Sequence, residues 1–228
     1  MDQKAVISGN CDNHNGATRS AFSLLELSII LVVSGLLLIG FIKSREVLNS
    51  AGLYKVMTEI NSYRAAIGTY HIAYGYYPGD DPNATSNLTT VADGSGDGNI
   101  NWSSESDNAD LAIIETGLMQ LPLEGVFRVS AFKHNLYHPP VTCSTLSLSD
   151  IGVNCHQLGS STDPNNAGFV PKEHYRIDRK LDDGIALAGK IRFRVYGDVS
   201  TATCADSGGY VFSNELAGCN LTYDITVD

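Results

Sequence analysis

The sequence lacks the motifs by which most enzyme classes are recognised. It contains no phosphate-binding P-loop, no Gly-x-Ser-x-Gly nucleophile elbow, no His-Glu-x-x-His zinc motif and no Gly-x-Gly-x-x-Gly dinucleotide fingerprint. Its six histidines are dispersed along the chain. We therefore expect a protein that is not an enzyme.

Charge is also scarce. Charged residues make up 18% of the chain, the formal net charge is -10, and the acidic residues are scattered. The densest basic stretch consists of Lys172, Arg176, Arg179 and Lys180. We expect it to be neutralised by the interspersed Glu173, Asp178, Asp182 and Asp183. A negative surface repels phosphate backbones, so the sequence predicts no nucleic-acid partner.

Long hydrophobic runs are absent with one exception, residues 22–42, which read FSLLELSIILVVSGLLLIGFI. A helix of this length spans roughly 30 Å, about the thickness of the hydrocarbon core of a membrane. The run is longer than the apolar region of a secretory signal peptide, and no Ala-x-Ala site follows it. The sequence therefore predicts a membrane anchor. Its orientation stays open, because Lys43 and Arg45 just after the run balance Lys4 and Arg19 before it.

Glu26 is the one charged residue inside this run. An ionised carboxylate at membrane depth costs several kcal/mol unless it is paired or reaches the interface, so such residues are typically functional. No basic residue lies within one helical turn of Glu26. Glu26 therefore either extends to the lipid headgroups or has a cationic partner from elsewhere.

Residues 21–27 (AFSLLEL) resemble the processing motif of type IV pilins and of the pseudopilins of type II secretion. The resemblance implies that a prepilin peptidase cuts between Ala21 and Phe22 and that the new amine of Phe22 is N-methylated. It also implies that the amine of a neighbouring subunit neutralises Glu26, the fifth residue of the mature chain. The chain departs from the usual motif at Ala21, where the family has Gly.

Beyond the apolar run the pattern becomes amphipathic. Apolar residues recur at helical spacing: Leu53, Val56, Ile60, Tyr63, Ile67, Tyr70 and Tyr74. Gly75 and Pro78 then end the predicted helix. The stripe suits a short coiled coil or packing against a sheet, and its tyrosines favour the sheet. We predict an α+β fold in which one long N-terminal helix, transmembrane in its first half, packs on an antiparallel β-sheet as in pilins.

This interpretation divides the chain into four parts. Residues 1–21 are a leader peptide, 22–42 a transmembrane and filament-core helix, 43–75 its amphipathic continuation, and 76–228 a globular domain in the periplasm. The resemblance implies a subunit of a type IV pilus-like or type II secretion filament, made in the bacterial inner membrane. Its partners would be prepilin peptidase and other pilin or pseudopilin subunits. The alternative is an anchored extracytoplasmic binding protein that depends on calcium.

A Gly- and Asp-rich loop is the source of the calcium prediction. Oxygen-bearing side chains occupy alternate positions at Asp93, Ser95, Asp97, Asn99 and Asn101, as in the first part of an EF-hand loop. The sequence departs from the EF-hand pattern at the twelfth position of the loop, where Ser104 stands in place of the acid that would bind calcium through both oxygens. The alternative is a solvated turn.

Alternating apolar residues predict strands in the C-terminal half. The clearest pattern covers residues 185–196, and others cover 210–212 and 221–227. Residues 76–110 are predicted to be mostly loop, and residues 111–121 a short helix or buried segment.

The cysteines indicate an oxidising compartment. One of the five lies in the predicted leader, which leaves an even number in the exported part. Four cysteines allow three pairings, and the sequence does not decide among them. Pairing of neighbours, Cys143–Cys155 and Cys204–Cys219, closes the two shortest loops and is our expectation. The second bond would also resemble the C-terminal disulfide loop of type IV pilins.

Overall fold

The structure is a computed structural model that describes residues 23–102, 104–120, 123–124, 127–130, 132–133, 135–207 and 209–227. The chain divides into two compact units, Met1–Glu46 and Val47–Asp228, and each is described by itself. The first unit contains the start of a long helix. The second contains the rest of that helix and an α+β domain.

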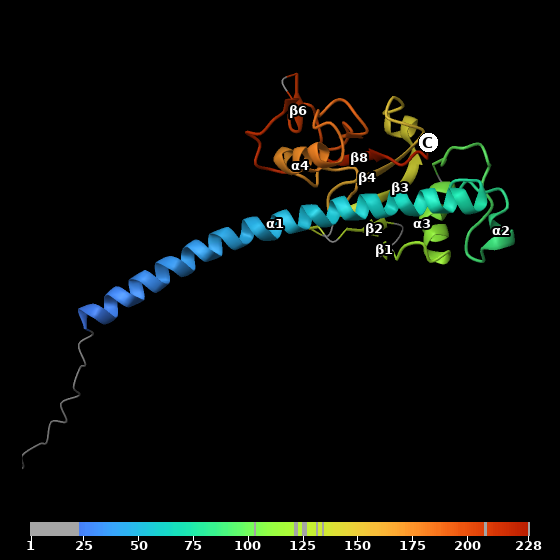
Figure 1. Cartoon of the computed structure of the whole chain (residues 1–228). Helices are drawn as coiled ribbons and strands as arrows, with labels where there is room; N and C mark the ends of the chain where they lie inside the picture. The colour runs from blue at the N-terminus through green and yellow to red at the C-terminus, as the bar shows by residue number, and fades with distance from the viewer. Residues whose placement is uncertain are drawn as a thin grey trace, which may run out of the picture. The chain divides into compact units, whose positions relative to one another are not determined.

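Helix α1 (Leu24–Tyr74) is continuous over 51 residues (Figure 1). Six of the seven residues in the predicted stripe are buried, and Tyr74 is half-buried. The buried stripe residues from Leu53 to Ile67 belong to one hydrophobic core with sheet residues such as Tyr137, Leu158 and Tyr223. Tyr70 belongs to a second, smaller cluster, against which Tyr74 packs. Burial of each large apolar side chain stabilises the fold by about 1.5–3 kcal/mol. The expected packing of this part of the helix on a sheet is therefore confirmed.

The helix ends where the sequence predicts. Gly75 adopts a φ of 81°, a left-handed conformation that glycine accepts without strain, and Pro78 follows three residues later.

The sheet has six antiparallel strands in the order β1-β2-β3-β4-β8-β5. Their bounds are β1 Leu123–Glu124, β2 Phe127–Val129, β3 Leu136–Thr142, β4 Asn154–Leu158, β5 Ile191–Arg192 and β8 Leu221–Asp224. The central strands β3, β4 and β8 are buried along their whole length. A separate hairpin pairs β6 (Ala205–Asp206) with β7 (Gly209–Tyr210).

Strand β3 carries a local irregularity. Its register with β4 shifts between His138 and Val141, and the two residues between them are Pro139 and Pro140. Proline has no N–H to donate to a ladder, so the bulge lies where regular pairing is impossible.

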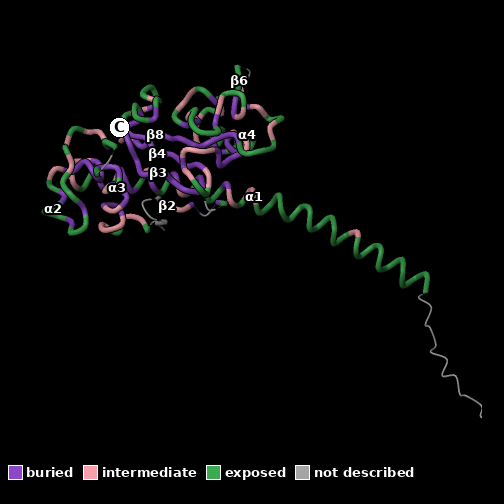
Figure 2. Tube along the Cα trace, turned by 180° about the vertical axis from the view of Figure 1, so that it is seen from behind, coloured by how far each residue is buried: buried purple, intermediate pink, exposed green. Residues whose placement is uncertain are grey.

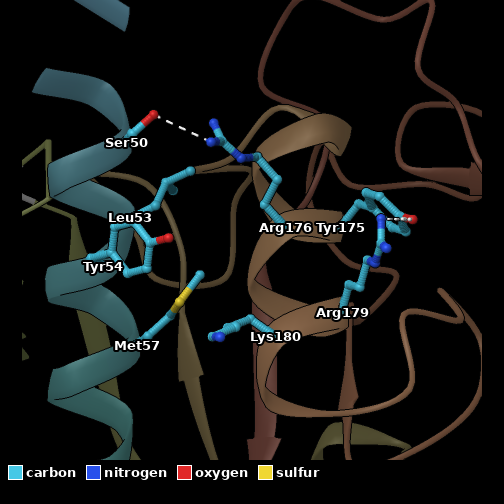
Figure 3. A pocket seen from close by; sticks show the side chains of 8 residues that line it. All are labelled: Ser50, Leu53, Tyr54, Met57, Tyr175, Arg176, Arg179 and Lys180. Atoms are coloured by element: carbon cyan, nitrogen blue, oxygen red, sulfur yellow. Dashed lines mark hydrogen bonds between the residues drawn. The ribbon is translucent and has the colours of Figure 1, made fainter. Parts of the chain in front are cut away.

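The remaining helices surround the second half of α1. They are α2 (Ala84–Asn87), α3 (Ser104–Glu115), the 3-10 turn η1 (Cys143–Leu146) and α4 (Pro171–Leu181). Helix α3 meets α1 near Tyr63, whose hydroxyl donates to Asp110. Helix α4 lies beside α1 near Ser50 and Leu53 (Figure 3).

Two local expectations need correction, and one is confirmed. Residues 185–196 form only the two-residue strand β5, because the segment before it folds into a turn. Asp182 holds this turn, since its carboxylate accepts from the N–H groups of Lys190 and Ile191. Residues 76–110 are mostly loop, as expected, and contain the short helix α2 and the start of α3. Residues 210–212 contribute one residue to β7, whereas β8 confirms the strand expected at 221–227 in its first half.

Candidate functional site

The apolar segment of α1 exposes nearly all of its side chains (Figure 2). Within the described part of the first unit, every residue except the half-buried Gly35 is exposed, and Leu24, Leu36 and Ile42 are 88%, 66% and 69% exposed. The segment is long and apolar enough to cross a membrane. An uncovered apolar surface of this size is unfavourable in water, so it requires lipid or protein around it.

The hydroxyl groups in this segment find partners within the helix. Ser28 Oγ donates to the Leu25 carbonyl at 2.7 Å, and Ser34 Oγ donates to the Ile30 carbonyl at 2.5 Å. Such bonds let a serine lie in an apolar environment without an unsatisfied group.

Glu26 differs from these serines. Its side chain is exposed in the first turn of α1, and it forms no hydrogen bond or ion pair with any residue that the structure describes. The nearest charged pair along the helix is Lys43–Glu46, with 3.4 Å between Nζ and Oε2, beyond the apolar run. The cleavage residues Ala21 and Phe22 and the predicted leader, residues 1–21, lie outside the described residues.

The predicted calcium loop is organised around a different residue, Asp80. This carboxylate is completely buried, and its two oxygens accept from Ser95 Oγ and from the backbone N–H groups of residues 96, 97 and 98 at 2.8–3.1 Å. Burial raises the pKa of Asp80, and these hydrogen bonds oppose the shift. Glu105 supports the same loop, since its oxygens accept from the N–H groups of Ser95 and Asn101.

The chemistry of this loop does not fit a calcium ion beside Asp80. The groups that face the carboxylate are N–H and O–H donors, whereas calcium requires oxygen acceptors. The expected ligands are already hydrogen-bonded, and Ser95, Asn99 and Asn101 all interact with the Asp97 carboxylate. Asp93 accepts from Thr85, Ser95 donates to Asp80, and Asp97 accepts from the N–H of Asn99. No function proposed below depends on calcium.

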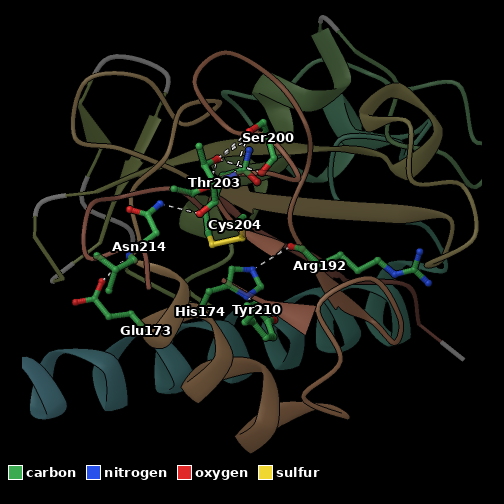
Figure 4. The surroundings of a disulfide bond; sticks show 12 residues. Glu173, His174, Arg192, Ser200, Thr203, Cys204, Tyr210 and Asn214 are labelled. Carbon is green, nitrogen blue, oxygen red and sulfur yellow. Dashed lines mark hydrogen bonds between the residues drawn. A yellow bond between two sulfur atoms is a disulfide. The ribbon is translucent and has the colours of Figure 1, made fainter. Parts of the chain in front are cut away.

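Two disulfides close the loops that we expected from the spacing of the cysteines. Cys143–Cys155 joins η1 to β4, and Cys204–Cys219 closes a loop of 15 residues at the β6–β7 hairpin (Figure 4). All four half-cystines are completely buried. Disulfides persist in oxidising compartments, so the globular unit is suited to an extracytoplasmic location.

A buried polar chain, not anticipated from the sequence, connects α4 with the β6–β7 hairpin. Tyr210 Oη donates to Asp178 Oδ2 at 2.5 Å and lies 2.8 Å from Nδ1 of His174. Burial raises the pKa of Asp178 to about 6 and lowers the pKa of His174 to about 4. The contacts fix the inner face of α4, so we assign them a structural role. Asp178 also lies within 4.8 Å of the carboxylates of Asp182 and Asp183, and exposed acidic groups of this kind are common without an ion.

Helix α4 also corrects our interpretation of the basic stretch. Of the four acids expected to neutralise its cations, Glu173 and Asp178 are buried on the inner face of the helix. Asp182 is half-buried and Asp183 exposed just beyond its end. Glu173 binds Lys133 and Asn49, whereas Asp178 binds Tyr210. Pro171 at the start of the helix and Glu173, which accepts from the Val170 N–H, are sequence signals that could have revealed α4.

The site residues thus fall into separate groups. Glu26 is isolated on the apolar helix, and the cysteines form two bonds. Of the predicted calcium ligands, Asp97 lies with Ser95, Asn99 and Asn101, whereas Asp93 binds Thr85. No known protein family, curated protein or solved structure matches this chain.

Proposed function

We propose that this protein is a structural subunit of a type IV pilus-like or type II secretion filament. In this proposal the chain is made as a prepilin in the inner membrane with its globular unit in the periplasm. Prepilin peptidase removes residues 1–21, and the mature helix then packs with those of other subunits.

One observation carries the proposal: an uncovered apolar helix segment contains a single carboxylate that has no partner within the described part of its own chain. An ordinary anchor has no need of a charge at this depth, and retention of one indicates a specific interaction. The motif around Glu26 identifies the partner that we propose, which is the N-terminal amine of Phe22 in an adjacent subunit.

This pairing would also select the correct axial register of neighbouring helices. A subunit displaced along the axis would bury Glu26 without its cation, and leaving one member of a buried pair unpaired costs about 3–5 kcal/mol. The surrounding leucines, isoleucines and valines pack almost equally well in many registers. The ion pair therefore supplies the positional information that the apolar surface lacks.

The globular unit supports the periplasmic location. Its two disulfides require an oxidising compartment for their formation, and the apolar segment precedes them in the chain. Among the described residues, α1 is the one helix that satisfies the criteria for a membrane span. A single anchor with a C-terminal exported domain accounts for both features.

N-terminal sequencing of the mature protein tests the proposal. In cells that contain prepilin peptidase we expect the chain to begin at an N-methylated Phe22, and in cells without the peptidase at Met1. Ala21→Gly restores the usual family residue and should be processed at least as completely, whereas Ala21→Leu should block cleavage. A native protein that retains residues 1–21 in the presence of the peptidase contradicts the proposal and favours an uncleaved, anchored binding protein.

A further inference from the structure

Helix α4 presents a cationic face to solvent. Its four exposed residues are Lys172, Arg176, Arg179 and Lys180, which are spaced at helical intervals of three to four residues or are adjacent. The acidic residues of the same helix point into the domain. This surface is therefore locally positive on a chain whose formal net charge is -10.

These cations form no ion pairs with the described residues, although Asp182 and the exposed Asp183 directly follow the helix. Arg176 donates to Ser50 Oγ at 3.3 Å, and Arg179 donates to Tyr175 Oη at 3.4 Å, both of which are neutral acceptors. The charges are therefore available to an external anion.

A groove of about 220 Å³ borders the cationic face (Figure 3). Leu53 and Met57 of α1 form its apolar floor, and Tyr54 lies beside them. On the α4 side, Arg176 extends toward α1 and Lys180 faces Met57. The groove thus combines a small apolar floor with a cationic rim, which suits a ligand that has both an anionic and an apolar part.

The groove and the apolar run are close in sequence. Ser50, at the rim of the groove, follows Ile42 by eight residues. Val47, Leu48 and Tyr54 in or beside this interval are exposed. Exposed tyrosine together with lysine and arginine next to a membrane span is typical of the headgroup region.

We propose that the cationic face of α4 and the adjoining groove bind the headgroups of anionic phospholipids at the surface of the membrane that holds the apolar run. The inference rests on the membrane anchor in the proposed function. The arginines would hold the phosphate groups through paired N–H donors, and the groove floor would contact the glycerol and upper acyl carbons. The contact would orient the globular unit before assembly into a filament.

Lysine acetylation of the full-length chain in nanodiscs tests this contact. One copy per disc is reconstituted in phosphatidylcholine alone or in a mixture of phosphatidylcholine with phosphatidylglycerol, and acetylation of each lysine is followed by mass spectrometry. We expect Lys172 and Lys180 to react at least about threefold more slowly with phosphatidylglycerol present, because each nearby cation contributes about 1 kcal/mol to binding an anionic surface. Lys190, which is paired with Asp224, should react equally in both. High salt should remove the protection.

A charge-removing variant provides the control. Arg176→Gln/Arg179→Gln should lose the protection of Lys172 and Lys180, whereas Lys55→Gln, on an exposed face of α1, should retain it. Equal acetylation rates in the two lipids overturn the lipid contact. If Lys172 and Lys180 are protected only when a disc holds several copies, whichever lipid is present, the lipid contact is also overturned. Such a result would indicate that an acidic surface of a second copy covers the cationic face. Failure of the chain to insert into discs contradicts the membrane anchor itself, so the two proposals are tested separately.

Discussion

Arg128 and Tyr137 lie directly opposite one another on β2 and β3, with the guanidinium carbon of Arg128 3.5 Å from the centre of the Tyr137 ring. The same guanidinium lies 4.6 Å from the ring centre of Tyr63 on α1. Tyr63 donates to Asp110 on α3 at 2.5 Å, and all four residues are buried. Burial raises the pKa of Asp110, and the Arg128 charge opposes that shift. Arg128 thus joins the sheet to α1, and Tyr63 extends the connection to α3.

Replacement of Arg128 should therefore destabilise the globular unit strongly. We expect Arg128→Met to lower the free energy of unfolding by about 3–5 kcal/mol, because the Asp110 carboxylate would stay buried without its counter-charge. Chemical denaturation of the full chain in detergent, followed by near-ultraviolet circular dichroism, measures the change. A second substitution, Asp110→Asn, should restore part of the loss.

Arg194 offers a matched control. It lies 4.6 Å from the ring centre of Tyr196 at the surface, so Arg194→Met removes a similar side chain and a similar aromatic contact. We expect a loss of about 1 kcal/mol. Equal losses for the two variants would show that burial of Arg128 has no special energetic role.

Asp80 should hold its loop without a bound ion. Asp80→Asn replaces one acceptor oxygen by an N–H₂ group that faces backbone donors, and we expect a loss of about 1–3 kcal/mol in EDTA and in calcium alike. Gly79 has a φ of 86° and a Cβ there would lie 2.1 Å from the Glu105 carbonyl oxygen, so Gly79→Ala should disrupt the same loop. Melting temperatures measure both effects.

Asp97→Asn separates this mechanism from the calcium prediction. Asp97 is exposed and does not contact Asp80 through its side chain, so we expect its replacement to change stability by no more than about 0.5 kcal/mol. A rise in melting temperature on addition of calcium that Asp97→Asn abolishes would instead support the calcium site.

Glu115 should make stability depend on acid pH. Its two oxygens accept four hydrogen bonds from the N–H and hydroxyl groups of Thr89 and Thr90, which lower its pKa from 4.5 to about 2. The unfolded chain therefore takes up this proton at a higher pH than the folded one. The stabilisation is complete above pH 4.5 and is lost as the pH falls from there toward 2.

The variant Glu115→Gln cannot ionise and should lose this dependence. Between pH 4.5 and pH 2 its melting temperature should fall less than that of the unmodified chain, whereas exposed Glu215→Gln should follow the unmodified chain. Parallel curves for all three proteins would exclude Glu115 as a source of acid sensitivity.

The disulfides should each contribute measurably to stability. For loops closed by bonds 12 and 15 residues apart, the entropic estimate is about 3 kcal/mol each. Cys204→Ala/Cys219→Ala should lower the free energy of unfolding by about this amount, and non-reducing peptide mapping should still show Cys143–Cys155. Free thiols at all four positions in the native protein would contradict an extracytoplasmic location.

The sequence was most informative where one pattern repeats over many residues. The apolar run and the stripe from Leu53 to Tyr70 each extend over several turns, and α1 follows them closely. Gly75 also ends the helix, because a residue without a side chain can adopt the left-handed conformation found there. In α1 the helical spacing of the apolar residues and their packing in the core agree, so the helix could be predicted without knowledge of distant contacts.

Helix α4 was not predicted, because its buried face is polar. Glu173, His174 and Asp178 interrupt the apolar period, and they are buried only because Lys133 and Tyr210, which lie far away in sequence, satisfy them. The cationic outer face becomes apparent only after the acidic residues are placed inside. Such an arrangement depends on tertiary contacts that no short window of sequence contains.

The role of Asp80 in the Gly/Asp loop could not be predicted for a related reason. The spacing of the loop residues predicts ligands for a calcium ion, which stays a prediction. The loop amides converge on Asp80, which precedes Ser95 by 15 residues. A buried carboxylate and a cation can both organise a glycine-rich turn. The orientation of the backbone N–H groups distinguishes them, and the sequence does not specify it.

Glu26 provides the last prediction, on assembly. Glu26→Gln keeps the shape of the side chain but removes the charge that would pair with the Phe22 amine of an adjacent subunit. We expect processing to continue and incorporation into filaments to fall at least tenfold, since loss of one member of a buried pair costs about 3–5 kcal/mol. Sheared-filament yield, compared with cellular protein by immunoblotting, measures incorporation.

Glu46→Gln is the matched control, because Glu46 is exposed on the same helix and pairs with Lys43 at the surface. Exposed pairs contribute about 0–1 kcal/mol, so this variant should assemble almost normally. Normal incorporation of Glu26→Gln would mean that the carboxylate only extends to the headgroups. Loss of processing together with assembly would instead place the role of Glu26 at the peptidase, before any contact between subunits forms.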